Sequence, residues 1–272
     1  MIIHSKAKIN LGLQVIRKRT DGFHELRTVF YPINLCDTIE IKPSSSFSYK
    51  DIGLRIDCRV ENNLIYKAYN ILSEKYTFPQ SVSVTMDKLI PFGAGLGGGS
   101  SNASSILQAL NEMFELRLSK QQLYEYASQL GSDCPFFILS KACIATGRGE
   151  LLTPIDFSLS GYYLTIVKSE DTVSTAEAYG GIRPAPRNTS LTDIIKLPIE
   201  QWKGVLKNDF EEHIFQAKPR IAEVKDKLYE LGAIYASMSG SGAAVYGIFK
   251  TMQGNIRDEF PKSYFVWSGE CI

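Results

Sequence analysis

The stretch PFGAGLGGGSSNASS, residues 91–105, has five glycines in the seven positions 93–99 and then continues into serines and an asparagine. The alternating apolar segment SVSVTM precedes it, and apolar residues at helical spacing follow it, so the local order is strand, glycine loop and helix. Successive glycines let backbone N–H groups approach an anion with no side chain in between, and the start of a helix adds partial positive charge. The stretch therefore predicts a phosphate-binding loop.

Two common phosphate loops do not fit this stretch. It formally contains GxGxxG at Gly93, Gly95 and Gly98, but the dinucleotide fingerprint needs an acid at the end of a second strand about 20 residues on. Glu112 and Glu115 fall inside the expected helix instead. A Walker A loop needs a lysine after its last glycine, and serines follow here. A turn without a ligand is a further alternative, which the entropic cost of so many glycines disfavours.

The composition excludes several classes of function. Thirty Lys and Arg residues nearly balance 29 Asp and Glu residues, for a formal net charge of +1, so no global field would attract nucleic acid or an anionic membrane. The five cysteines show no CxxC spacing and the three histidines are dispersed, which gives no signal for a metal site. No stretch approaches the ~18 apolar residues of a membrane span. We therefore expect a cytoplasmic protein without a structural metal, a nucleic-acid partner or a membrane partner.

Hydrophobic periodicity places several polar side chains. Residues 9–15 alternate between apolar and polar types, which predicts a half-buried strand with Lys8 and Asn10 on the face opposite the core. Asn63 precedes a helical pattern and is expected to cap it. The segment SDCP, which contains Asp133, is expected to be irregular, so that this carboxylate can face a cleft.

The length of 272 residues favours two modest domains. The polar segment SLSG, residues 158–161, is the expected boundary, which divides the chain into residues 1–158 and 159–272. Within the first part, Ser119 and Gln122 predict a capping box at a helix start. The second part approximates the order β-α-β-β-α-β of a ferredoxin-like domain. The predicted fold class is α+β.

Three motifs together resemble the signatures of the GHMP kinases, which include galactokinase, homoserine kinase and mevalonate kinase. They are SKAKINLGL near the start, the glycine stretch in its full wording PxGAGLGGGSSNA, and SMSGSGAAVY at residues 237–246. The segments DGFHEL and GSDCPFF are most similar to the branch of the family that phosphorylates 4-diphosphocytidyl-2-C-methyl-D-erythritol in the non-mevalonate isoprenoid pathway. The match runs to about residue 249 and so covers nearly the whole chain.

The resemblance implies an ATP-binding N-terminal domain like the second domain of ribosomal protein S5, a ferredoxin-like C-terminal domain, and an active site in the cleft between them. With Mg²⁺ as the metal ion, ATP would donate its γ-phosphoryl group to the C2 hydroxyl of that cytidyl diphosphate substrate. The implied catalytic residues are Lys8 and Asp133. Asp133 would take the proton of the acceptor hydroxyl, and Lys8 would keep Asp133 ionised or stabilise developing charge.

The resemblance also implies residues that bind the two substrates. The ATP residues are Asn63, Pro91, Gly93, Ala94, Gly95, Leu96, Gly97, Gly98, Gly99, Ser100 and Ser101. The residues for the cytidyl substrate are Asn10, Phe23, His24, Tyr179, Ser239 and Gly240. Ser100 or Ser101 would supply one Mg²⁺ ligand. Phe23 stands where the family usually has tyrosine, which keeps a ring face for stacking on cytosine and loses a hydroxyl. Tyr179 would form the opposite wall.

Simpler interpretations stand beside these. Lys8 fits an exposed strand lysine, Asp133 a helix-end aspartate and Tyr179 a core aromatic residue. Other functions are a GHMP kinase for a sugar or homoserine, an ATP-binding regulator without catalysis, and an RNA-binding module suggested by the S5-like fold alone. The DGFH segment disfavours the first because those acceptors have no base to stack, and the near-zero net charge disfavours RNA. We expect a monomer or a weak homodimer.

Overall fold

The computed structural model describes residues 1–54, 59–185 and 189–272. The chain forms two compact units. Unit 1 consists of Met1–Ala7, Leu35–Phe92 and Gly97–Ser140, and unit 2 consists of Lys8–Asn34, Gly93–Leu96 and Lys141–Ile272. Two long strands, β1 (Ile2–Lys18) and β2 (His24–Ser44), contribute to both units. The units therefore do not coincide with residues 1–158 and 159–272, and a domain boundary at residue 158 stays a prediction.

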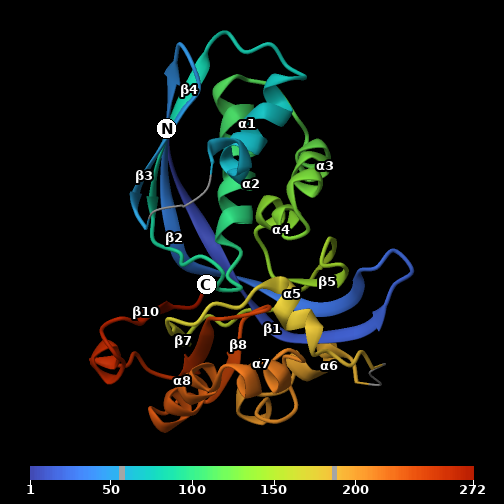
Figure 1. The fold of residues 1–272 in the computed structure, drawn as a ribbon, viewed down its shortest axis with the longest axis vertical. Helices are drawn as coiled ribbons and strands as arrows, with labels where there is room; N and C mark the ends of the chain where they lie inside the picture. The colour runs from blue at the N-terminus through green and yellow to red at the C-terminus, as the bar shows by residue number, and fades with distance from the viewer. Residues whose placement is uncertain (55–58, 186–188) are drawn as a thin grey trace. The chain divides into compact units, whose positions relative to one another are not determined.

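Unit 1 is a sheet with helices packed on one face. The second half of β2 pairs antiparallel with β4 (Ser81–Lys88), and β4 pairs parallel with β3 (Ser48–Gly53). The helices are η1 (Val60–Asn62), α1 (Leu64–Ser73), α2 (Gly98–Met113), α3 (Lys120–Leu130) and α4 (Cys134–Leu139). Figure 1 shows α1 to α4 on the same side of these strands. Buried aliphatic side chains of the sheet and these helices form the core of the unit.

The sequence of β4 explains which face of the sheet is buried. In SVSVTMDK, Val82, Val84 and Met86 belong to the core, whereas the residues between them are more exposed. Lys88 follows at the same two-residue period and is 3% exposed. A charged side chain thus lies on the apolar face of the sheet, which is costly without a partner.

Asp37 of β2 is the partner of Lys88. The Lys88 ammonium donates to Asp37 Oδ2 at 2.5 Å, and both side chains are almost fully buried. Asp37 Oδ1 accepts from the backbone N–H groups of Leu89 and Ile90, both at 2.8 Å. One carboxylate therefore ties the end of β4 and the two residues after it to β2, just before the glycine loop begins.

The capping signals in unit 1 are confirmed. Asn63 Oδ1 accepts from the backbone N–H of Ile65 at 2.9 Å at the start of α1. Ser119 and Gln122 form the expected capping box at the start of α3. These side chains satisfy N–H groups that the start of a helix leaves without an intrahelical partner.

The segment SDCP differs from the expectation. Ser132 and Asp133 form a turn, but Cys134 and Pro135 open α4. The prediction of an irregular segment was wrong for these two residues because proline fits the first turn of a helix, where its missing N–H costs no hydrogen bond. Asp133 is the residue before the helix, and its side chain makes no capping bond to it.

Unit 2 contains a four-stranded antiparallel sheet. Its strands are β7 (Tyr163–Lys168), β8 (Tyr235–Met238), β9 (Val245–Phe249) and β10 (Phe265–Glu270), in the spatial order β10-β7-β9-β8. Between β7 and β8 the chain forms α5 (Thr175–Gly180), α6 (Leu191–Ile195), η2 (Ile199–Gln201), α7 (Glu211–Ala217) and α8 (Pro219–Glu230). The turn η3 (Ile256–Glu259) precedes β10. This order confirms the ferredoxin-like pattern, with the second helix reduced to η3.

The start of β2 and part of β1 also belong to unit 2. The first half of β2 pairs with β5 (Cys143–Gly147), which turns back into β6 (Leu151–Pro154). The segment before α7 runs beside β1, because Leu13 donates to Lys207 O and accepts from the Asp209 N–H, both at 2.9 Å. This contact brings a segment from far along the chain against β1.

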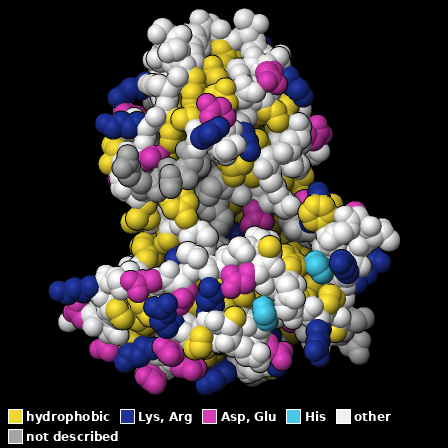
Figure 2. All heavy atoms as spheres, viewed as in Figure 1, with side chains coloured by type: hydrophobic (Ala, Val, Ile, Leu, Met, Phe, Trp, Pro, Cys, Tyr) yellow, Lys and Arg dark blue, Asp and Glu magenta, His cyan; other side chains and the backbone are white. Residues whose placement is uncertain are grey.

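The surface agrees with the near-zero net charge. On the face in Figure 2, positive and negative side chains are interspersed over unit 2. Ion pairs such as Arg220 with Asp171, at 2.9 Å, account for part of this mixture. Across the described parts of the chain, none of the helices combines the length and the apolar character that crossing a membrane requires.

The buried pair in unit 1 yields a stability prediction. Asp37→Asn should lower the free energy of unfolding by about 3 kcal/mol, because it leaves the Lys88 ammonium buried without a counterion. Urea unfolding measures this change. Glu40→Gln is the matched control: its partner is Lys42, the two side chains are 38% and 60% exposed, and its cost should stay below about 1 kcal/mol. Equal costs would contradict the importance of the buried pair.

Candidate active site

The glycine loop has the backbone geometry of an anion site. Gly93, Gly95 and Gly97 have φ angles of +55°, +71° and +71°, a region that glycine enters without steric cost. Gly97 is the residue before α2, and its carbonyl accepts from the Ser101 N–H at 2.9 Å. The N–H groups of the first turn of a helix have no intrahelical partner, so the start of α2 offers donors and partial positive charge to a phosphate.

Gly95 is the closest point of approach between the glycine loop and the third motif. A Cβ at this position would lie 1.9 Å from the carbonyl oxygen of Ser239. The Gly95 carbonyl accepts from Lys8 Nζ and from Ser239 Oγ, both at 2.9 Å. Two further backbone bonds join the motifs: Ala243 N–H to Gly93 O at 3.0 Å, and Ala244 N–H to Ala94 O at 3.2 Å. The two motifs thus pack backbone against backbone.

Lys8 and Asn10 share one face of β1, as predicted, but that face is not open to solvent. Lys8 is 3% exposed and Asn10 is 2% exposed. The prediction of a half-buried strand was therefore wrong at these two positions. Lys8 Nζ donates to Asn10 Oδ1 at 2.6 Å, and Asn10 Nδ2 donates to Thr28 Oγ1 at 2.9 Å. Asn10 N–H also donates to Ser239 Oγ at 3.3 Å. The third motif, distant in sequence, covers this face.

Asp133 is held near the start of α2 by its neighbour. Burial raises the pKa of the Cys134 thiol to about 11, although the neighbouring Ser100 and Ser104 side chains oppose this shift. Ser104 Oγ donates to Cys134 O at 2.7 Å. The half-buried Asp133 precedes Cys134 directly, so its backbone lies beside the first turns of α2. Lys8 belongs to unit 2 and Asp133 to unit 1, and the expected electrostatic pairing between them stays a prediction.

A cavity of about 130 Å³ lies beside the first turn of α2 in unit 1. Its lining residues are Asn62, Asn63, Leu64, Lys88, Phe92, Gly99 and Asn102. Lys88 Nζ stands 5.2 Å from the centre of the Phe92 ring. Within the described residues, Asn102 Oδ1 is buried without a hydrogen-bond partner. The predicted residues Asn63 and Gly99 therefore share a cavity with polar groups that can bind a ligand.

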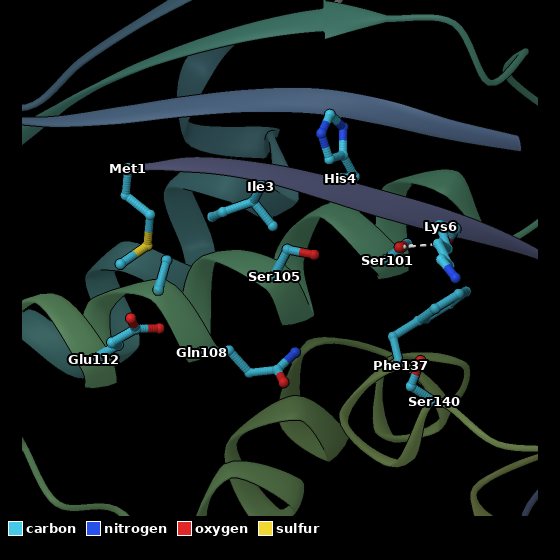
Figure 3. A pocket seen from close by; sticks show the side chains of 11 residues that line it. Met1, Ile3, His4, Lys6, Ser101, Ser105, Gln108, Glu112, Phe137 and Ser140 are labelled. Atoms are coloured by element: carbon cyan, nitrogen blue, oxygen red, sulfur yellow. Dashed lines mark hydrogen bonds between the residues drawn. The ribbon is translucent and has the colours of Figure 1, made fainter. Parts of the chain in front are cut away.

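Ser101 lines a second cavity, not the 130 Å³ cavity. Its hydroxyl donates to Lys6 O at 2.6 Å and lies 2.7 Å from Ser5 Oγ. Figure 3 shows it in a second cavity of unit 1, about 270 Å³ in volume, between β1, α2 and α4. The Ser101 hydroxyl is therefore already hydrogen-bonded within unit 1. Over residues 1–54, 59–185 and 189–272, no three His, Cys, Asp or Glu side chains gather as a metal site.

The remaining predicted loop residues are placed by packing. Ala94 and Leu96 are buried, and the Leu96 carbonyl accepts from the Lys8 N–H at 3.0 Å. A Cβ on Gly98 would lie 2.9 Å from Ile90 Cγ2 and 3.1 Å from Lys88 Nζ. Pro91, partly buried, leads into the loop from the Asp37 anchor. The packing of these residues therefore fixes the shape of the loop.

Two of the three aromatic residues predicted to bind cytosine, His24 and Tyr179, meet in unit 2. The rings of His24 and Tyr179 are stacked, with centroids 4.6 Å apart and an interplanar angle of 21°. Phe23 is 54% exposed, and the Arg148 guanidinium lies 5.0 Å from its ring centre. Tyr179 also packs edge-on against Phe210. Each predicted ring therefore has one face covered by a protein group.

The electrostatics favour a neutral imidazole at His24. Burial lowers the pKa of His24 below its usual 6.5, and the nearby Lys18 lowers it further. At neutral pH this ring has one nitrogen that accepts and one that donates a hydrogen bond. Such a ring can recognise the edge of a base.

Comparisons with known proteins agree with this geometry. The family model for the GHMP kinase N-terminal domain matches residues 63–141, and the model for the C-terminal domain matches residues 197–265. A protein of Azobacteroides pseudotrichonymphae named 4-diphosphocytidyl-2-C-methyl-D-erythritol kinase is 50% identical over 92% of this chain and 94% of its own. A protein of the same name from Parabacteroides distasonis is 44% identical over 99% of both chains.

The chain belongs to the GHMP kinases.

Solved structures agree with this assignment. A crystal structure of 4-(cytidine 5'-diphospho)-2C-methyl-D-erythritol kinase superposes with a TM-score of 0.82 at 30% identity and covers 100% of this chain and 99% of its own. Mevalonate kinase of Methanococcus jannaschii, at 16% identity, shares the fold with a TM-score of 0.70 over 100% of this chain and 97% of its own. This GHMP kinase is therefore a small-molecule kinase with the predicted α+β fold, which decides against the alternative of a regulator without catalysis.

Two residues of this GHMP kinase site were missed from the sequence. Lys88 could have been found, because it continues the two-residue period of buried side chains in β4, but its partner Asp37 is 51 residues away. Asn102, by contrast, follows the serines of the glycine stretch and was expected beside a bound anion, and it lines the 130 Å³ cavity. Arg148 lies in the turn between β5 and β6, and nothing local predicts its contact with Phe23.

The contact between Gly95 and Ser239 yields a stability prediction, for which Gly93 in the same loop provides the control. Gly95→Ala should lower the free energy of unfolding by well over the 1–2 kcal/mol that a left-handed alanine costs, because its Cβ would clash with Ser239 O. Gly93→Ala should cost only about 1–2 kcal/mol, since nothing lies within 4 Å of its Cβ position. Urea unfolding of both variants measures the difference. Equal destabilisation would mean that the two motifs are not in close contact.

The neutral state of His24 is open to direct measurement. An NMR titration should give His24 a pKa below 6.5, and Lys18→Met should move it upward because a positive charge is removed. Lys42→Met, which changes a lysine of unit 1, should leave it unchanged. A His24 pKa at or above 6.5 in the unmodified chain would show that the ring is not buried against Tyr179 in solution.

Proposed function

We propose that the chain transfers the γ-phosphoryl group of ATP to the C2 hydroxyl of 4-diphosphocytidyl-2-C-methyl-D-erythritol, a step in non-mevalonate isoprenoid precursor biosynthesis. The observation that carries this proposal is the near full-length similarity, at 44–50% identity, to proteins that bear the name of this kinase. The meeting of His24 and Tyr179 in unit 2, with Phe23 adjacent in sequence to His24, supports it, because such rings suit a pyrimidine base.

ATP is proposed to bind along the glycine loop. Its phosphates would accept from the free N–H groups at the start of α2, with Gly93, Gly95 and Gly97 keeping side chains away. The adenine would enter the 130 Å³ cavity, where Asn63 forms a wall. Asn63 would keep its capping role there, since its Oδ1 is bonded to the Ile65 N–H.

Mg²⁺ is the divalent ion we propose for this site. GHMP kinases use ATP and generally a divalent metal. Mg²⁺ commonly binds through one or two protein oxygens plus water and phosphate oxygens, and Ser100 in the first turn of α2 supplies one such oxygen. The ion would neutralise charge on the phosphates.

Catalysis is proposed to use Asp133 and Lys8. As the acceptor oxygen attacks the γ-phosphorus, an O–P bond forms, the bond to the leaving ADP oxygen breaks, and the hydroxyl proton passes to the Asp133 carboxylate. Lys8, held by Asn10 Oδ1 and Gly95 O, would stabilise negative charge that develops on the transferred group. Because Lys8 is already held in place, it can stabilise this charge without reorganisation during the reaction.

The cytidyl end of the substrate is proposed to bind at Phe23, His24 and Tyr179. Cytosine would stack on Phe23, and Tyr179 would form the opposite wall once its ring leaves His24. Neutral His24 would then hydrogen-bond the edge of the base. Asn10, Ser239 and Gly240 would contact the alcohol or phosphate part. A cytoplasmic location and a monomer or weak homodimer stay predictions.

Mg²⁺-dependent ADP release tests the proposed acceptor. The cytidyl diphosphate substrate is compared with homoserine, galactose, mevalonate and a sample without acceptor. Release with the cytidyl compound alone is the expected result. Release with another acceptor would keep the GHMP kinase and discard this substrate, and release without any acceptor would indicate hydrolysis of ATP by water.

The role of Asp133 gives a kinetic prediction. Asp133→Asn should lower kcat by roughly 10²–10⁴-fold, the usual contribution of a general base, while the KM for ATP changes little. Asp258→Asn changes an exposed aspartate of unit 2 in the same way, and its kcat should stay unchanged. Steady-state ADP release measures both variants. A kcat of Asp133→Asn close to that of the unmodified chain would remove Asp133 from the mechanism.

A further inference from the structure

Asn208 is a buried amide whose hydrogen-bonding groups are all used. It lies in unit 2, just before α7, and is 3% exposed. Asn208 Nδ2 donates to the carbonyl oxygens of Met238 and Gly240, both at 2.8 Å, and Oδ1 accepts from the Phe210 N–H at 3.0 Å. The backbone on either side is bonded to Leu13 of β1. The amide is therefore fixed in position and holds the third motif at two points.

These two bonds fix the orientation of two peptide groups. In a trans peptide the C=O and the N–H point in opposite directions. The Met238 carbonyl is held by Asn208, and the N–H of the same peptide, on Ser239, donates to Ala244 O at 2.9 Å. The Gly240 carbonyl is held in the same way, so the N–H of Ser241 must point away from Asn208.

The Ser241 N–H is a donor without an acceptor. Within the described residues, neither the Gly240 N–H nor the Ser241 N–H makes a hydrogen bond, whereas the Gly242 N–H closes the turn on Ser239 O at 3.0 Å. Gly240 has a φ of +56°, and a Cβ on it would lie 3.2 Å from both Asn10 Oδ1 and Gly95 O. The turn thus lies against the atoms that bind Lys8 Nζ.

We propose that Asn208 is a positioning residue that aims the Ser241 N–H at an oxygen of the phosphoryl group during its transfer. The proposal rests on the proposed function, because it takes the phosphoryl group to lie beside Lys8. A donor that is already oriented stabilises charge in the transition state without reorganisation. Asn208 itself does not touch the substrate: it acts through the Gly240–Ser241 peptide.

The test is Asn208→Asp, which keeps the size and the acceptor for Phe210 but replaces the donor by an oxygen that repels two carbonyls. We expect kcat to fall roughly 10- to 100-fold, on the scale of losing one oriented backbone or amide donor. The KM values for ATP and for the acceptor should change less than about threefold, because the bond forms mainly in the transition state.

Asn111→Asp is the matched control. Asn111 Oδ1 accepts from the Leu118 N–H at 2.8 Å and Nδ2 donates to Leu118 O at 3.3 Å, so the same substitution breaks the same kind of bond in unit 1. Its kcat should remain within about threefold of the unmodified chain. Asn208→Ser, a neutral and smaller change, is measured beside it in case Asn208→Asp does not fold, and should show the same fall in kcat.

Two results would overturn the proposal: a kcat of a folded Asn208 variant equal to that of the unmodified chain, or a rise in KM with kcat unchanged. A fall in kcat of the same size in Asn111→Asp would also do so. An error in the proposed substrate would be detected separately, by the acceptor panel. If the unmodified chain phosphorylates another alcohol in the acceptor panel, the same comparison is made with that alcohol, since the phosphoryl group comes from ATP in each case.

Discussion

The close approach of two glycine-rich backbones is the constraint on which the site in unit 2 depends. At Gly95 the main chain lies so near Ser239 that no side chain fits. The same contact lets the Gly95 carbonyl accept from both Lys8 and Ser239. Lys8 in turn holds Asn10, and Asn208 holds the third motif from its other side. The positions of the Lys8 ammonium and the Asn10 amide therefore depend on this packing contact, while Asn208 orients the free Ser241 N–H.

In unit 1, a buried ion pair positions the residues that lead into the glycine loop. The Asp37 carboxylate anchors the residues that lead into the glycine loop and keeps the Lys88 ammonium buried. Burial lowers the pKa of Lys88, while Asp37 opposes this shift. The Lys88 charge is paired with Asp37, so attraction of an anion depends on the partial positive charge and free N–H groups at the start of α2. These features favour an anion at the loop, which is what a nucleotide phosphate supplies.

Local signals in the sequence predicted local structure well, and failed where distant segments meet. The strand, glycine loop and helix, the cap at Asn63 and the capping box at Ser119 depend on neighbouring residues, and each is confirmed. Alternation predicted the shared face of Lys8 and Asn10 but not its burial, because the cover comes from the glycine loop and the third motif, at sequence separations of 87 and 229 residues. Lys88 and Asn208 were missed for the same reason: their partners are fixed only by the tertiary fold.

The proposed reaction is the transfer of a phosphoryl group from ATP to the C2 hydroxyl of the cytidyl substrate. The most direct measurement is NMR of the product made from substrate carrying ¹³C in the methyl group on C2. We expect the methyl signal to become a doublet through coupling to ³¹P across the C2 oxygen, with one ADP formed per product. A methyl singlet with a new phosphomonoester signal would place the phosphoryl group on another hydroxyl and would contradict the proposed reaction.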